Sequence, residues 1–428
     1  MAAGISVQLK AHDGGSDWES TAHSFAPPAA APASKPIAVG VHGDLAAIEQ
    51  DWRRFERFAD CTVFQTFDWL STWQRHIGAR NDVSPAIVVG RDGAGDILFI
   101  LPLATQPLNF ARELTWLGTE LCDYNAPLLA PGFSARIDAE RFKEIWRSVL
   151  QRIQDERHLG FDLVRLFKMP ATIGPQANPM LGLEAMPNPS GAYATSLGEN
   201  WEAFYAAKRS SSTRGRDRTK RKRLAGFGEI KMVTPQSAND ALRTVAVLIE
   251  QKTQAFARMG VANLFERPGH AEFYRAIATD PALRRLVHVS RLEVGPHIAA
   301  ANIGLTFRDT YYHLQASYTD GELARFGPGA AHLHALMCYA IERGAKVYDF
   351  TIGDETYKRD WCDGAQNLYD HISFVTWRGA LVGAPAMAAQ RVKRLIKQTP
   401  SLWRAYIKMR ALIGTLKSPA GKTTRSAP

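Results

Sequence analysis

The sequence is poor in cysteine and has no long apolar run. Its four cysteines, Cys61, Cys122, Cys338 and Cys362, lie far apart among 428 residues, without a Cys-x-x-Cys pair or a histidine at zinc-ligand spacing. We therefore expect reduced thiols and no metal site. No stretch reaches the about 18 apolar residues of a transmembrane helix, and the N-terminus lacks the basic-then-apolar pattern of a secretion signal. These absences predict a cytoplasmic protein.

Acidic residues are absent after Asp370. From there to the C-terminus the chain carries eleven Lys and Arg, whereas the part up to Asp370 has 41 basic and 42 acidic residues, so the net charge of +10 belongs to the tail. We expect a basic amphipathic tail over 381–428, with two short helices within 391–417 separated at Pro400. Such a tail can lie on an anionic membrane surface, bind an acidic partner protein, or pack on the body with its charges solvated.

The body of the chain reads as two α/β halves. An Ala/Pro-rich, disordered N-terminus over 1–36 precedes domains expected at 37–195 and 196–380. Both halves show the same order of helices, hairpin, third strand, helix and last strand, which favours a duplicated α/β unit. The expected elements of the first half are helices from 44 and 64, a hairpin over 85–103, a strand over 113–117, a helix over 139–157 and a strand over 161–167. Those of the second half are helices over 200–224 and 239–258, a hairpin over 286–307, a strand over 311–318, a helix over 328–343 and a strand over 346–350.

A glycine turn opens the helix expected at 328–343 in the second half. The turn reads Arg325-Phe326-Gly327-Pro328-Gly329-Ala330, and a helix start leaves unpaired N–H groups that favour an anion. The helix buries one face that includes Leu333 and Leu336, and Gly344 is placed to end it because the residue after a helix often needs positive φ. The alternative is a plain helix start with Arg325 as a solvated charge.

A basic run over 208–223 lies between the halves. It holds nine Lys and Arg and one acidic residue, Asp217, which favours a polyanion such as nucleic acid, the phosphates of coenzyme A or an anionic polysaccharide. No aromatic residue is interleaved for base stacking, so nucleic acid is disfavoured. The alternative is a solvated helix face.

The second half resembles the core of the GNAT acyltransferases, in which such a turn cradles the pyrophosphate of acyl-CoA. The stretch from Tyr348 to Trp361, which contains Gly353-Asp354-Glu355-Thr356-Tyr357-Lys358, is similar to the signature of the bacterial CelD-like acetyltransferases of cellulose and exopolysaccharide synthesis. That family is related to the FemAB transferases, and the resemblance covers roughly 45–380. It implies an α/β fold of tandem GNAT-like domains, each with a mixed, mainly antiparallel sheet flanked by helices, the first domain being degenerate.

The resemblance implies acetyl-CoA, or another acyl-CoA, as co-substrate, with no metal. The expected cofactor-binding residues are Arg325, Phe326, Gly327, Gly329, Ala330 and Lys358. Direct transfer needs a hydrogen-bond donor for the thioester oxygen, a base for the acceptor and an acid for the thiolate, but no covalent Ser or Cys nucleophile. Candidate bases are Asp354, Glu355, Asp349 and His313, and candidate acids are Tyr318 and Tyr357.

The sequence thus predicts an N- or O-acyltransferase that acts on a sugar or polysaccharide precursor. One alternative is a FemAB-like transferase that takes its acyl group from aminoacyl-tRNA, with the tRNA on the basic run. The other is a non-catalytic GNAT-like scaffold that recruits a polysaccharide-synthesis complex through its tail.

Overall fold

The computed structural model describes residues 36–353 and 355–399, all but the first of them in a compact unit that begins at Ile37. The predicted disordered N-terminus up to residue 35 and the tail from Pro400 lie outside the described residues, so these predictions stay as they were. Within the described ranges, no helix combines the length and the apolar character needed to cross a bilayer.

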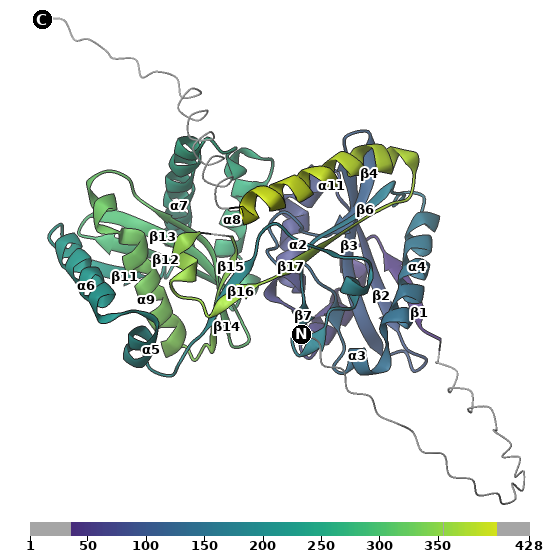
Figure 1. Ribbon diagram of the computed structural model, residues 1–428, viewed down its shortest axis with the longest axis horizontal. Helices are drawn as coiled ribbons and strands as arrows, with labels where there is room; N and C mark the ends of the chain where they lie inside the picture. The colour runs from purple at the N-terminus through teal and green to yellow at the C-terminus, as the bar shows by residue number, and fades with distance from the viewer. Residues whose placement is uncertain (1–35, 354, 400–428) are drawn as a thin grey trace, which may run out of the picture. The chain divides into compact units, whose positions relative to one another are not determined.

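Two mixed sheets form the body, as Figure 1 shows. The order of the first sheet is β1-β2-β3-β4-β6-β17-β9, with β5 paired to β3, and that of the second is β11-β12-β13-β14-β15-β10-β16. The strands of the first sheet are β1 (Ala38–His42), β2 (Ser84–Arg91), β3 (Ile97–Leu108), β4 (Ala111–Trp116), β5 (Leu128–Leu129), β6 (Leu163–Pro170), β9 (Met186–Pro187) and β17 (Leu368–Phe374). Those of the second are β10 (Ala192–Ser196), β11 (Ile230–Val233), β12 (Val287–Val294), β13 (His297–Phe307), β14 (Thr310–Tyr318), β15 (Val347–Ile352) and β16 (Gly364–Gln366).

Each sheet contains the same unit of antiparallel hairpin, third strand, helical crossover and parallel strand. The crossovers are α4 (Ala139–Asp155), which leads from β4 to β6, and α9 (Pro328–Glu342), which leads from β14 to β15. The other main helices are α1 (Glu49–Glu56), α2 (Phe67–His76), α5 (Trp201–Lys208), α6 (Ser211–Ala225), α7 (Ala238–Met259), α8 (His270–Thr279), α10 (Thr356–Arg359) and α11 (Trp377–Gln398). The repeated order read from the sequence is therefore present in the fold.

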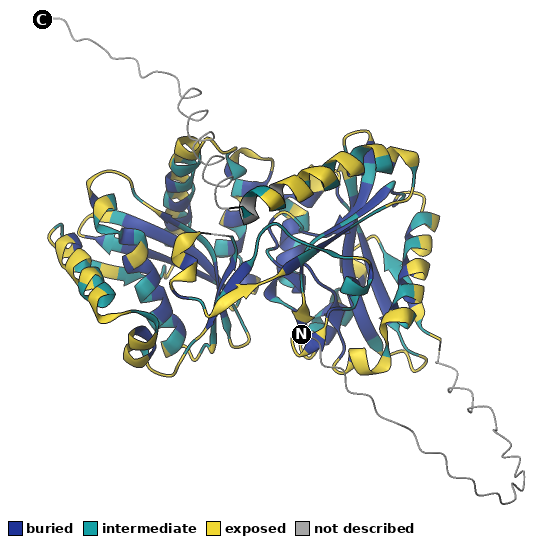
Figure 2. Ribbon diagram, viewed as in Figure 1, coloured by how far each residue is buried: buried dark blue, intermediate teal, exposed yellow. Residues whose placement is uncertain are grey.

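The helix ends follow local chemistry. Asp138 accepts a hydrogen bond from the N–H of Arg141 at the start of α4, and Ser237 caps α7 in the same way. Gly344 has φ of +78° after α9, as predicted. Large apolar side chains on the inner faces of the helices then cover the sheets, whose strands are mostly buried in Figure 2.

Two strands, β10 and β17, lie outside the two repeated units. β10 lies before the second unit and pairs with β15, whereas β17 follows that unit and pairs with β6 of the first sheet. The sheets therefore divide the chain differently from the boundary predicted at 195/196, since residues 368–374 belong to the first sheet. The pattern of the sequence did not reveal α8 or β17, and of α11 it revealed only the part from residue 391 on, as the first of the two tail helices.

Candidate active site

β14 and β15 pair only where they begin. The parallel register joins Thr310, Tyr311 and Tyr312 to Val347, Tyr348 and Asp349, and it stops there although both strands continue. Beyond this point the sheet is open between His313–Tyr318 and Phe350–Ile352. Polar side chains of both strands therefore lie beside backbone N–H and C=O groups that have no partner across this strand pair.

The first turn of α9 follows the end of β14. Gly327 has φ of +68° and precedes Pro328 at the first helical position, and the first helical hydrogen bond runs from the N–H of Ala331 to Gly327 at 3.0 Å. The N–H groups of Gly329 and Ala330 are thus free of helical carbonyls and available to an anion.

Gly329 leaves room for the side chain of Tyr318. A Cβ atom at position 329 would lie 3.0 Å from Cδ1 of Tyr318, so a larger residue would crowd that ring. Tyr318 is itself exposed, next to the first turn of α9. Arg325 is exposed, pairs with Glu322 at 2.5 Å and lies over the ring of Phe326.

Asp349 is a buried carboxyl group at the last position of β15 that pairs with β14. Its Oδ1 accepts hydrogen bonds from the hydroxyl of Tyr124 and from the N–H of Thr351, both at 2.7 Å. Burial raises the pKa of Asp349 to about 7, although both hydrogen bonds oppose the rise. Thr351 has φ of +59°, a strained conformation for a β-branched residue, and its bond to Asp349 helps to hold it there.

Lys358 is a buried cation close to this carboxyl group. Its Nζ donates to the carbonyl of Ile352 at 2.9 Å and pairs with Glu355 at 3.0 Å. Lys252 of α7 is the second cation: burial lowers its pKa, Glu355 raises it and Lys358 lowers it further. Two lysines and the carboxyl groups of Glu355, Asp349 and Asp123 therefore interact electrostatically at this side of the opening.

His313 lies within the sheet rather than free in the opening. Its Nδ1 shares a hydrogen bond of 3.0 Å with the hydroxyl of Tyr348. Burial and the charges of Lys358 and Lys252 lower the pKa of His313 to about 3, so the imidazole is neutral at physiological pH.

The first half contributes the loop that carries Asp123 and Tyr124. Burial raises the pKa of Asp123, while the charge of Lys168 and a hydrogen bond with Thr351 lower it. Lys168 orders the loop, because its Nζ donates to the carbonyls of Thr119 and Cys122 at 3.0 and 2.8 Å. The site is therefore built from both halves.

The predicted site residues are only partly together. His313, Glu355 and Lys358 gather around the opening, and Gly327, Gly329, Ala330 and Tyr318 surround the first turn of α9. Tyr357 is exposed on α10, with its ring 6.1 Å from that of Phe350. Asp354 lies outside the described residues.

Sequence reasoning missed Tyr124, Asp123 and Lys252. Tyr124 lies 225 residues before Asp349 in the sequence, so no local pattern could connect the two. Lys252 sits in an ordinary amphipathic helix, and no local pattern distinguishes it.

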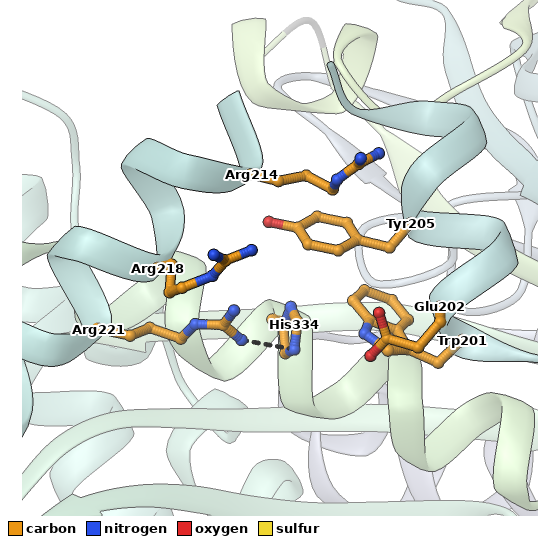
Figure 3. Close-up of a pocket in the computed structure, with 7 residues that line it drawn as sticks. All are labelled: Trp201, Glu202, Tyr205, Arg214, Arg218, Arg221 and His334. Carbon is orange, nitrogen blue, oxygen red and sulfur yellow. Dashed lines mark hydrogen bonds between the residues drawn. The ribbon is translucent and has the colours of Figure 1, made fainter. Parts of the chain in front are cut away.

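Most of the basic run lies in α6, and three arginines of this helix line a pocket. The pocket has a volume of about 260 Å³, and its walls come from α5, α6 and α9. Figure 3 shows the arginines extending from α6 toward the aromatic residues of α5 and His334 of α9. The lining residues are Trp201, Glu202, Tyr205, Arg214, Arg218, Arg221 and His334.

One family of known proteins matches part of the chain. Residues 211–359, from the start of α6 to the end of α10, match the family model described as an acetyltransferase (GNAT) domain. The predicted enzyme class, an acyltransferase of GNAT type, is confirmed by this match. No curated protein matches the chain.

The fold of the whole body is similar to that of FemX. The crystal structure of FemX superposes with a TM-score of 0.55 at 10% identity, over 81% of this chain and 99% of FemX. A conserved protein of unknown function from Bacteroides thetaiotaomicron gives 0.49 at 9% identity, over 79% and 100%. A tandem GNAT protein from the clavulanic acid biosynthesis pathway gives 0.43 at 11% identity, over 79% and 98%. The predicted fold, tandem GNAT-like α/β halves, is confirmed by the unit repeated in the two sheets and by the GNAT match over the second half.

Proposed function

We propose that this protein transfers an acyl group from acyl-CoA, in the first instance acetyl-CoA, to an amino or hydroxyl group of a sugar or polysaccharide precursor. The observation that carries the proposal is the opening between β14 and β15, with the first turn of α9 at one end and the carboxyl group of Asp349 at the other. The description of the matched family supports the acyl-CoA donor. The saccharide acceptor rests on the CelD-like stretch around Lys358.

The donor would lie in the opening with its diphosphate on the first turn of α9. The N–H groups of Gly329 and Ala330 would donate to phosphate oxygens, and Gly327 gives the chain the turn that aims them. Arg325 and Phe326 would border the same group. The strand backbone exposed by the divergence would accept the amide groups of the pantetheine arm and donate to the thioester oxygen.

The chemistry requires one base and one acid. The acceptor N–H or O–H attacks the thioester carbon, its proton passes to the base, the C–S bond breaks and the departing thiolate takes a proton from the acid. We propose Asp349 as the base, because a pKa of about 7 lets it accept a proton near neutral pH. Within the described residues its Oδ2 accepts no hydrogen bond, whereas Oδ1 is used twice.

The other predicted bases are less suited where the structure describes them. Glu355 is paired with Lys358, and His313, with a pKa of about 3, is a weak base that would orient a hydroxyl acceptor. Asp354 stays a candidate from the sequence. Tyr318, beside the first turn of α9, and Tyr357, on α10, stay candidates for the acid.

Calorimetric titration with acetyl-CoA and with the unreactive analogue desulfo-CoA tests the donor. We expect micromolar binding, about −8 kcal/mol, which Gly329→Trp abolishes by crowding Tyr318 and filling the turn. Gly364→Trp makes the same change in open space and should bind normally. Absence of binding to the wild-type protein would refute the acyl-CoA donor and favour aminoacyl-tRNA or a scaffold.

A second proposal concerns α11 and an anionic membrane surface. The exposed apolar residues Trp377, Leu381, Val392 and Leu395 fall within about 60° of arc at 100° per residue. The opposite face, with Gly379, packs against the backbone of Asp162 in the first half. At the same 100° per residue, Arg378 and Arg391 lie on the two sides of the stripe, as basic residues do in helices that lie on lipid.

A further inference from the structure

The pocket between α5, α6 and α9 has an excess of positive charge. Among the described residues, Arg218 has no hydrogen bond or ion pair, and Arg221 contacts only the ring nitrogen of His334, at 2.6 Å. Glu202 is the one carboxylate in the lining. Asp217 does not line the pocket, and its carboxylate already accepts a hydrogen bond of 2.8 Å from the hydroxyl of Tyr205.

His334 adds an uncharged wall that keeps Arg221 in place. A guanidinium group only donates hydrogen bonds, so Nε2 of His334 accepts and its imidazole is neutral. Burial, and then the charge of Arg221, lowers the pKa of His334 to about 4, in agreement with this state. The arginine is thus oriented without being neutralised.

Arg214 makes the rim of the pocket rigid. Its guanidinium donates to the carbonyls of Ala206 and Arg209 at 3.1 and 3.0 Å, at the end of α5. Trp201 and Tyr205 of the same helix stack with ring centres 5.0 Å apart. Oriented guanidinium groups beside fixed aromatic walls suit a phosphate, which accepts two parallel hydrogen bonds from one arginine.

The pocket lies close to the proposed diphosphate site. His334 follows Ala330 by four residues, about 6 Å along α9. At the other side, the end of α6 packs on the segment before the glycine turn, since Leu224, Leu323 and Phe326 belong to one hydrophobic cluster. An anion bound here would therefore lie beside the part of the donor that the first turn of α9 would hold.

We propose that Arg218 and Arg221 bind the 3′-phosphate on the ribose of coenzyme A, a group separate from the diphosphate. This inference rests on the proposed function. It assigns the basic helix α6 to selection of the donor: coenzyme A and its thioesters would be favoured over carriers that have the pantetheine arm but not this phosphate.

The test compares acetyl-CoA with acetyl-3′-dephospho-CoA by calorimetry. Arg218→Met removes a charge that has no protein partner, so the fold should be kept. Arg216→Met is the matched control, because it removes an exposed arginine of the same helix outside the pocket. The wild-type protein should prefer acetyl-CoA at least tenfold, as expected for a lost charge-assisted hydrogen bond. Arg218→Met should reduce this preference by weakening acetyl-CoA alone, with Arg221 keeping the remainder, and Arg216→Met should keep it in full.

Each contrary outcome has its own meaning. Equal affinity of the wild-type protein for both donors would overturn the assignment and leave the proposed function standing. Equal weakening of both donors by Arg218→Met would also overturn it, since the arginine would then act only through general charge. If neither donor binds, the proposed function itself fails. Binding of tRNA that both variants weaken alike would identify a nucleic-acid surface instead.

Discussion

The buried carboxyl group of Asp349 allows a prediction that separates stability from catalysis. In the unfolded chain this group has a pKa near 3.8, whereas in the folded protein the value is about 7. The folded state therefore binds the proton more tightly, so the contribution of Asp349 to stability is fully present below pH 3.8. It is lost as the pH rises through 7.

The size of this change in stability follows from the one proton that the folded state binds and the unfolded state has lost. Between pH 5 and pH 7 the unfolded carboxyl is ionised and the folded one is protonated, so the loss is about 1.4 kcal/mol per pH unit. Over the two units this gives about 2 kcal/mol, because the folded carboxyl is already half ionised at pH 7. Asp349→Asn keeps an oxygen that can accept from Tyr124 and Thr351 but cannot ionise, so we expect urea unfolding of the variant to lack this part of the pH dependence.

Glu56→Gln provides the control for catalysis. Burial raises the pKa of Glu56 to about 7 as well, and its Oε2 accepts from the N–H of Phe67 at 2.8 Å, away from the opening between β14 and β15. Both variants should flatten the stability profile. Only Asp349→Asn should abolish the rise of the transfer rate through pH 7. An unchanged rate profile in Asp349→Asn would refute its role as base, and an unchanged stability profile would refute the raised pKa.

Three further predictions follow from single contacts. Tyr124→Phe removes a donor to the carboxylate of Asp349, so the rising limb of the rate profile should move to higher pH, and stability should fall by about 1 kcal/mol. Gly379→Val places a Cβ 2.0 Å from the carbonyl oxygen of Asp162, so chemical denaturation should show a loss of more than about 2 kcal/mol, and an unchanged midpoint would contradict this packing. Trp377→Ser should weaken sedimentation with anionic, but not neutral, liposomes about tenfold, and equal sedimentation of variant and wild type would argue against the lipid surface.

The repeated α/β order could be read from the sequence because it depends on local patterns. The alternation in β12 and β13, the apolar face of α9 and the glycine at 344 all act within a few residues. β17 could not be assigned in this way, because its place in the first sheet depends on pairing with β6, about 200 residues earlier. Apolar periodicity shows that a strand has a buried face but not which sheet covers it.

The site residues also divide into those that a local pattern indicates and those that depend on long-range contacts. The glycine turn and Lys358 stand in contiguous stretches, so the sequence could propose them as site residues. The raised pKa of Asp349 depends on burial and on Tyr124, and neither is a property of its neighbours along the chain. The order of residues along the chain therefore could not single out Asp349 among the candidate bases.

The hydrogen bond from Tyr124 to Asp349 gives the first half a part in building the site, although this half has no glycine turn of its own. Its loop supplies a donor to Asp349, and Lys168 holds that loop through backbone carbonyls. The exchanged strand β17 then ties the two halves covalently and by hydrogen bonds, because it continues the second half and completes the first sheet. A carboxyl group with a pKa near 7 needs a stable, closely packed environment, since a small opening would rehydrate it and lower its pKa. In the proposed mechanism the first half would act on the chemistry by keeping Asp349 buried, even though the donor would bind in the second half.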